Sequence, residues 1–148
     1  MDTSDPILDC FPKLRTCAWK KTSPETIFYN CISWAVNDPR RRWWEPIPSF
    51  YWPSEAPRER TIYAYQRAFE SCGFSVCSNS GLELGFEKLA LYALSGEPQH
   101  AARQLPTGMW TSKLGTLEDI SHETLEALEG EEYGTVVLIM RRAIGGVS

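Results

Sequence analysis

Between residues 74 and 142, turn residues divide the sequence into short segments of strand type. The last segment, Thr135–Arg142, contains the continuous apolar run Val136-Val137-Leu138-Ile139-Met140. A run of this kind is typical of a strand covered on both faces, so we expect it near the centre of a sheet. Four further strands are predicted, at residues 74–77, 86–93, 99–105 and 109–114.

Three helices are predicted around these strands. The clearest is Arg58–Cys72, where four residues at helical spacing form one apolar face and Gly73 suits the C-terminal end. Asn30 can cap a short helix over residues 31–36, and a further helix is expected over residues 121–128. The apolar face consists of Ile62, Tyr65, Phe69 and Cys72. This order of elements predicts an α+β domain with N-terminal helices packed on a mostly antiparallel sheet.

The length of 148 residues fits one domain. Prolines at positions 6, 12 and 24 predict an irregular segment over residues 1–25, followed by the domain itself at 26–142 and a flexible tail at 143–148. Residues 40–57 are rich in Trp and Pro, which excludes regular structure but requires the aromatic side chains to be covered. This loop either packs across the core or lines a substrate cleft with Trp43 and Trp44.

The charge and the cysteine count exclude several classes of protein. A net charge of −4 argues against a nucleic-acid or anionic-membrane binder, and no apolar run reaches the roughly 20 residues that cross a bilayer. The first residues lack the features of a secretion signal, so we expect a cytoplasmic protein. Five cysteines, an odd number, argue against a disulfide scaffold. With two histidines and no C-x-x-C pair, we expect neither a metal site nor a bound cofactor.

Cys31 is the candidate nucleophile. It follows Asn30 at the expected start of a helix, where unpaired backbone N–H groups favour a negative charge. A thiolate at such a position has a lowered pKa and is the reactive form of cysteine, and the same N–H groups can bind an oxyanion. A buried, unreactive thiol in the first turn is the alternative.

The hairpin after His100 predicts which side chain lies beside that histidine. A three-residue loop between Leu105 and Met109, with Gly108 in the left-handed position, places Ser112 on the same face as His100 and turns Lys113 outward. A two-residue loop at Thr107-Gly108 places Lys113 beside His100 instead. We favour the first register because it directs the large apolar residues inward and the lysine outward.

These motifs resemble the papain-like cysteine hydrolases, a superfamily of thiol proteases and amidases. The likeness is to the small bacterial amidase and peptidase branch that includes the CHAP amidases, and it rests on Asn30-Cys31 at a helix start, His100 opening a strand and a polar residue on the next strand. The stretches Tyr29–Ala35, His100–Arg103 and Trp110–Gly115 also resemble a bacterial family of uncharacterised proteins.

The resemblance implies a papain-like fold and a hydrolase that cleaves an amide or peptide bond through an acyl-enzyme. It assigns Cys31 as nucleophile, His100 as base and Ser112 as the residue that orients the histidine. Family members usually have Asn, Asp, His or Glu in the last role, so Asp119 or His122 could replace Ser112, although we expect His122 to be solvated. A catalytically inactive module that binds a protein partner is the alternative function.

Overall fold

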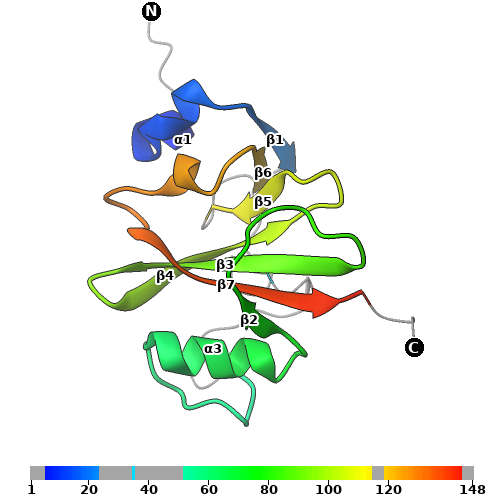
Figure 1. Cartoon of the computed structure of the whole chain (residues 1–148). Helices are drawn as coiled ribbons and strands as arrows, with labels where there is room; N and C mark the ends of the chain where they lie inside the picture. Colours follow the sequence, from blue (N-terminus) through cyan, green and yellow to red (C-terminus); the bar gives the residue numbers. More distant parts are fainter. Residues whose placement is uncertain (1–5, 24–34, 36–51, 115–118, 145–148) are drawn as a thin grey trace, which may run out of the picture.

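The computed structural model describes residues 6–23, 35, 52–114 and 119–144. Its centre is a seven-stranded sheet in the order β1-β6-β5-β4-β3-β7-β2, and all of the strand pairs described are antiparallel (Figure 1). The strands are β1 (Trp19–Ser23), β2 (Ser75–Cys77), β3 (Phe86–Leu94), β4 (Glu97–Gln104), β5 (Trp110–Lys113), β6 (Asp119–His122) and β7 (Thr135–Ala143). The predicted α+β class and antiparallel sheet are therefore confirmed.

The helices do not form the N-terminal layer that the sequence predicted. Among the elements described in full, one nine-residue helix, α3 (Ile62–Glu70), covers one side of the sheet, and three short ones lie on the other side (Figure 1). The short helices are α1 (Pro6–Cys10), η1 (Pro12–Thr16) and η2 (Glu126–Leu128). The predicted arrangement is wrong because short helical turns from both ends of the chain share one face. None of the helices described is long and apolar enough to cross a membrane.

Residues 6–23 are ordered, although the sequence predicted an irregular segment over 1–25. Pro6 and Pro12 each begin a short helix instead of interrupting one, because the first turn of a helix does not need the N–H that proline lacks. Leu14 is fully buried, and β1 pairs with β6 at one edge of the sheet. The folded part of the chain therefore begins well before residue 26.

Helix α3 bears out the predicted apolar face. The Thr61 hydroxyl accepts a hydrogen bond from the Ala64 N–H at 3.1 Å, so the helix begins four residues later than Arg58. Tyr65 and Phe69 are buried in a cluster with Trp52, whose indole N–H donates to the Pro57 carbonyl. The described end of the Trp- and Pro-rich loop thus packs into the core.

The β4–β5 hairpin has the predicted three-residue register. Leu105 and Met109 close the turn through the Leu105 N–H and the Met109 carbonyl at 2.7 Å, and Gln104 pairs with Trp110. Gly108 has a φ of 92°, as the left-handed turn position requires. The alternative register, with Lys113 beside His100, is excluded.

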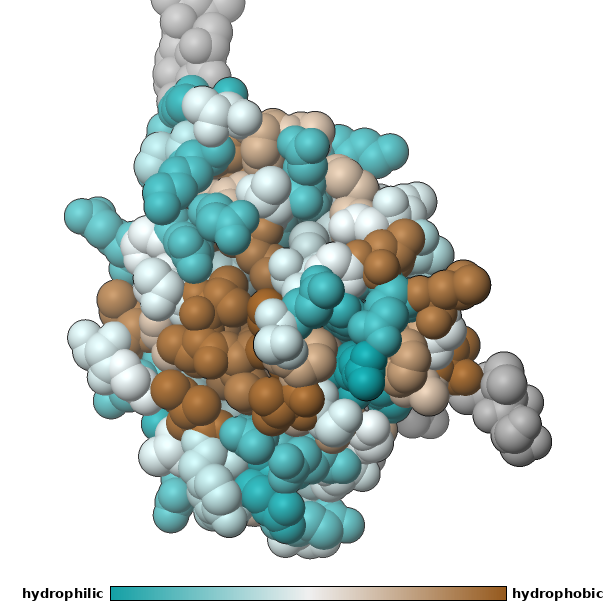
Figure 2. Space-filling model, viewed as in Figure 1, coloured by the Kyte–Doolittle hydropathy of each residue, from teal (hydrophilic) through white to brown (hydrophobic). Residues whose placement is uncertain are grey.

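Two predictions fail at the C-terminal end. The helix expected over 121–128 is instead β6 followed by the short η2, because residues 119–122 pair along β5 and pairing overrides local helix propensity. Strand β7 is not central, since its outer neighbour β2 reaches only residues 139–141. Val137 on β7 is accordingly 41% exposed. Figure 2 shows apolar side chains gathered over the middle of the molecular face in view, where β7 crosses in Figure 1.

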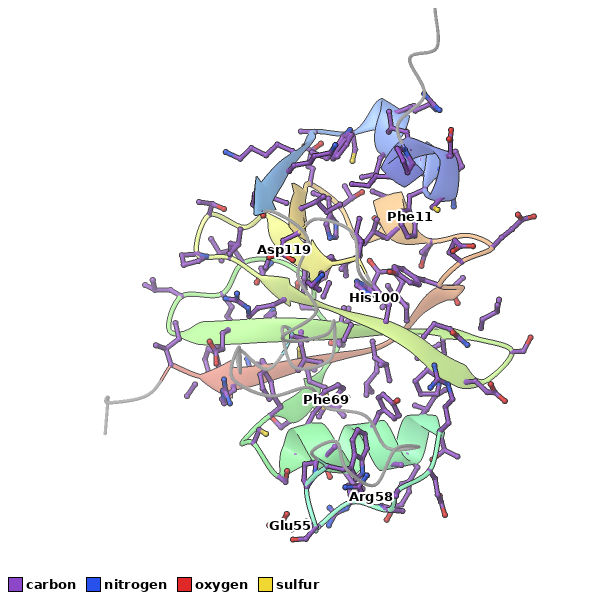
Figure 3. All side chains as sticks on the ribbon, turned by 180° about the vertical axis from the view of Figure 1, so that it is seen from behind. Phe11, Glu55, Arg58, Phe69, His100 and Asp119 are labelled. Atoms are coloured by element: carbon purple, nitrogen blue, oxygen red, sulfur yellow. The ribbon has the colours of Figure 1, made fainter. Side chains whose placement is uncertain are left out.

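The sheet separates two apolar clusters. One lies on the α3 side and contains Phe69, Ala101 and Ala35, which is helical and buried. The other lies under α1, η1 and η2 and contains Phe11 and Tyr92. Figure 3 shows Phe69 on one side of the sheet, with Phe11 and His100 on the other.

Candidate functional site

The predicted site is described only in part. Cys31, Asn30, Trp43 and Trp44 lie outside the described residues, so the pairing of Cys31 with His100 stays a prediction. His100 and Ser112 are described, and the structure brings them together.

Three neighbouring strands place three polar side chains in a row. His100 comes from β4, Ser112 from β5 and His122 from β6. The Nε2 atom of His100 lies 3.0 Å from the Ser112 Oγ, which lies 2.8 Å from the Nε2 atom of His122. The Nδ1 atom of His122 in turn lies 2.9 Å from the backbone carbonyl oxygen of Thr124. The three side chains and this carbonyl form one continuous hydrogen-bonded chain, which we call the His100 relay.

The relay lies in the interior. His100, Ser112 and His122 have no exposed surface. Tyr133 stacks on the His100 ring with parallel planes and centroids 4.1 Å apart, and Tyr92 packs against the same ring at 5.4 Å. The Tyr92 hydroxyl donates to the Leu125 carbonyl at 2.6 Å, which fixes that ring. The expectation that His122 is solvated is therefore wrong: β6 folds back along β5 and turns the imidazole inward.

Burial keeps both imidazoles neutral near pH 7. Desolvation lowers the pKa of His100 well below its ordinary value, and the nearby His122 lowers it further. Desolvation also lowers the pKa of His122, to about 4, and the hydrogen bond to the Thr124 carbonyl opposes this shift only partly.

The Nδ1 atom of His100 is a buried polar atom of the relay that has no hydrogen-bond partner among the described residues. A buried polar atom without a partner costs about 1–3 kcal/mol, so such an atom calls for an explanation, which can be catalytic.

The opposite face of the same strands carries a second polar group. Lys113 and Asp119 are cross-strand partners, and both are completely buried. The prediction that Lys113 turns outward to solvent is thus wrong, because this face of the sheet is covered too. Side chains alternate along a strand, so Asp119 points away from the face that carries Ile120 and His122. Of the two alternatives to Ser112, only His122 reaches the relay.

His122 is the residue of the relay that sequence reasoning placed wrongly. The signal that could have found it is the same alternation rule that identified Ser112, applied to one more strand. Treating residues 119–122 as a strand paired with residues 110–113 brings Ser112 and His122 onto one face.

A cavity of about 530 Å³ lies apart from the relay, beside the loop that precedes β3. Buried Lys88 holds this loop, since its ammonium donates to the Asn79 and Gly81 carbonyls at 2.6 and 2.8 Å and pairs with Glu83. Leu84 at the rim is fully exposed and Ile144 is half-exposed. The volume is typical of a ligand pocket, and the apolar rim is typical of a contact surface.

No group of three or more His, Cys, Asp or Glu side chains that could hold a metal ion occurs within residues 6–23, 35, 52–114 and 119–144.

Comparison with known proteins gives a family. The sequence profile of a domain of unknown function, DUF7689, matches residues 20–141, which is most of the chain, so the chain belongs to this family. Comparisons with curated proteins and with solved structures gave no significant match.

Proposed function

We propose that this member of the DUF7689 family is a papain-like cysteine hydrolase that cleaves an amide or peptide bond, with Cys31 as nucleophile and His100 as base. The observation that supports it is the state of the His100 ring. Its Nε2 atom is held by Ser112 at 3.0 Å, and its Nδ1 atom is buried without a partner among the described residues. A general base needs one nitrogen that orients the ring and one that is free to take a proton.

The proposed reaction has two steps. The Cys31 thiol gives its proton to His100 Nδ1, its sulfur attacks the amide carbonyl carbon, and the C–N bond breaks as the proton passes to the leaving amine. Water then attacks the thioester, gives a proton to Nδ1, and the C–S bond breaks as that proton returns to the sulfur. The lowered pKa of His100 favours a neutral thiol and imidazole in the resting enzyme, so the proton moves only as the sulfur attacks.

Alkylation of Cys31 tests the proposal. We expect iodoacetamide to modify Cys31 at least about tenfold faster than exposed Cys10, because the adjacent base takes the thiol proton as the sulfur attacks the reagent. His100→Gln should slow the reaction at Cys31 by about tenfold and leave Cys10 unchanged. Mass spectrometry of peptides from the folded protein measures each rate. A Cys31 that resists modification, or that reacts equally in the His100→Gln variant, contradicts the proposal.

Two observations favour a second candidate function, a non-catalytic module that binds a protein partner. His100 is completely buried, although a catalytic base must meet its substrate. Ala35, which is four residues after Cys31, packs on the α3 side of the sheet, whereas His100 points from the opposite side. In this candidate, the relay is a structural polar network and the cavity beside Leu84 takes an apolar side chain of the partner.

Binding of an apolar dye tests the second candidate, in which the cavity beside Leu84 is a contact site. If the cavity is a contact site, anilinonaphthalene sulfonate should bind there, and Leu84→Ser should weaken binding about threefold because apolar area at the rim is lost. The matched control is Leu94→Ser, which changes an exposed leucine that does not line the cavity. Fluorescence titration gives both affinities. Equal weakening by the two substitutions counts against a contact site at this cavity.

A further inference from the structure

We infer that His122 is a positioning residue which, through Ser112, keeps the proton of His100 on Nε2 and leaves Nδ1 as the basic atom. This inference rests on the proposed function for its purpose, but the proton positions follow from the relay alone. It assigns His122 a role that acts on His100 through Ser112.

The donor and acceptor roles along the relay are determined by the Thr124 carbonyl at one end. The Thr124 carbonyl oxygen can only accept a hydrogen bond, so the Nδ1 atom of His122, 2.9 Å away, must carry a proton. A neutral imidazole has one N–H group, and His122 is buried and neutral near pH 7. The Nε2 atom of His122 therefore has no proton and acts as an acceptor.

Ser112 transmits these hydrogen-bond roles from His122 to His100. A serine hydroxyl has a single proton, and the bare Nε2 atom of His122, 2.8 Å from the oxygen, takes it as a hydrogen bond. The same oxygen is then left as an acceptor toward the Nε2 atom of His100, 3.0 Å away, which must carry the proton. Because His100 is neutral, its Nδ1 atom is bare.

The relay explains how a serine can select one tautomer of His100 in the orienting position. A hydroxyl can donate or accept, so Ser112 alone would stabilise either tautomer of His100. A carboxamide or carboxylate oxygen only accepts, and it therefore selects the Nε2–H form. In this chain, His122 gives Ser112 the same selectivity because it occupies the hydroxyl proton.

The tautomers can be measured directly by nitrogen-15 NMR of the histidine rings in the wild-type protein. The expected result is an Nε2–H tautomer for His100 and an Nδ1–H tautomer for His122. In His122→Leu, the Ser112 hydroxyl is free to donate to His100, so a sizeable fraction of His100 should move to the Nδ1–H tautomer. His122→Gln is the conservative variant, because its carboxamide oxygen can reach Ser112, and it should restore the Nε2–H form.

The outcomes separate this inference from the hydrolase proposal. An Nδ1–H tautomer of His100 in the wild type overturns the inference, and this measurement needs no variant that might fail to fold. An unchanged His100 tautomer in folded His122→Leu also overturns it. If the tautomers are as expected but Cys31 resists alkylation, the role of His122 is supported and the hydrolase proposal is contradicted. If Cys31 reacts rapidly but the His100 tautomer is unchanged in His122→Leu, the hydrolase proposal is supported and the role of His122 is contradicted.

Discussion

Acidification from about pH 7 to about pH 4.5 should lower the free energy of unfolding by several kcal/mol, because His100 and His122 are buried in the neutral form. In the folded state, burial lowers the pKa of His100 well below its ordinary value and that of His122 to about 4. In the unfolded chain, both imidazoles return to an ordinary pKa of about 6.5. Below that pH, the unfolded state binds more protons than the folded state, so stability falls as the pH falls.

The size of the stability loss follows from the difference between the unfolded and folded pKa values of each histidine. Stability is fully present above about pH 6.5 and is lost as the pH falls toward the folded pKa values. His122 alone accounts for about 3 kcal/mol across its shift, and His100 adds a further loss. Such a loss is a large part of the stability of an ordinary domain, which is about 5–15 kcal/mol.

Urea unfolding followed by tryptophan fluorescence across this pH range measures the prediction. His122→Gln removes one titrating group and should flatten the pH dependence of the free energy of unfolding, whatever its effect at neutral pH. His100→Gln should flatten it in the same way. The prediction fails if wild type and variants lose stability in parallel, because carboxylates then dominate the acid response.

The strands were predictable where local pattern and turn chemistry agreed. The hairpin at Leu105–Met109 is the clearest case, since Gly108 fixed the loop and the loop fixed the pairing of Gln104 with Trp110. That register alone predicts that Ser112 lies beside His100. Helix α3 was also predictable, because its apolar face repeats at helical spacing, but the prediction missed the cap at Thr61 and began the helix at Arg58.

The failures have one physical origin, which is that pairing and burial between distant segments override local signals. Residues 119–122 have no strand pattern of their own, and they form β6 because β1 and β5 pair with them on both sides. The burial of Lys113 likewise depends on what covers the α3 side of the sheet, and no property of its own strand encodes that. The His100 relay joins three strands, so only a register extended from β4 through β6 could have predicted it.

Replacing Gly134 by alanine should cost more stability than any other single methyl group added to a described glycine. Gly134 has a φ of 76°, and a Cβ built there would lie 2.0 Å from the Ala93 carbonyl oxygen and 2.8 Å from the Leu94 Cα. Both neighbours are backbone atoms at the end of β3, which cannot move without breaking the pairing of Ala93 with Thr135. We expect a loss of at least about 4 kcal/mol, which is exceptional for one substitution.

Gly96→Ala is the matched control, because Gly96 has a nearly identical φ of 81° and nothing within 4 Å of an added Cβ. It should cost only the strain of a left-handed alanine, about 1–2 kcal/mol. Urea unfolding of the two variants therefore separates backbone strain from the collision with β3. Equal losses of stability in the two variants would mean that the backbone at Gly134 can shift away from β3. A large excess for Gly134→Ala would mean that the backbone at Gly134, next to the Tyr133 that stacks on the His100 ring, cannot move away from β3.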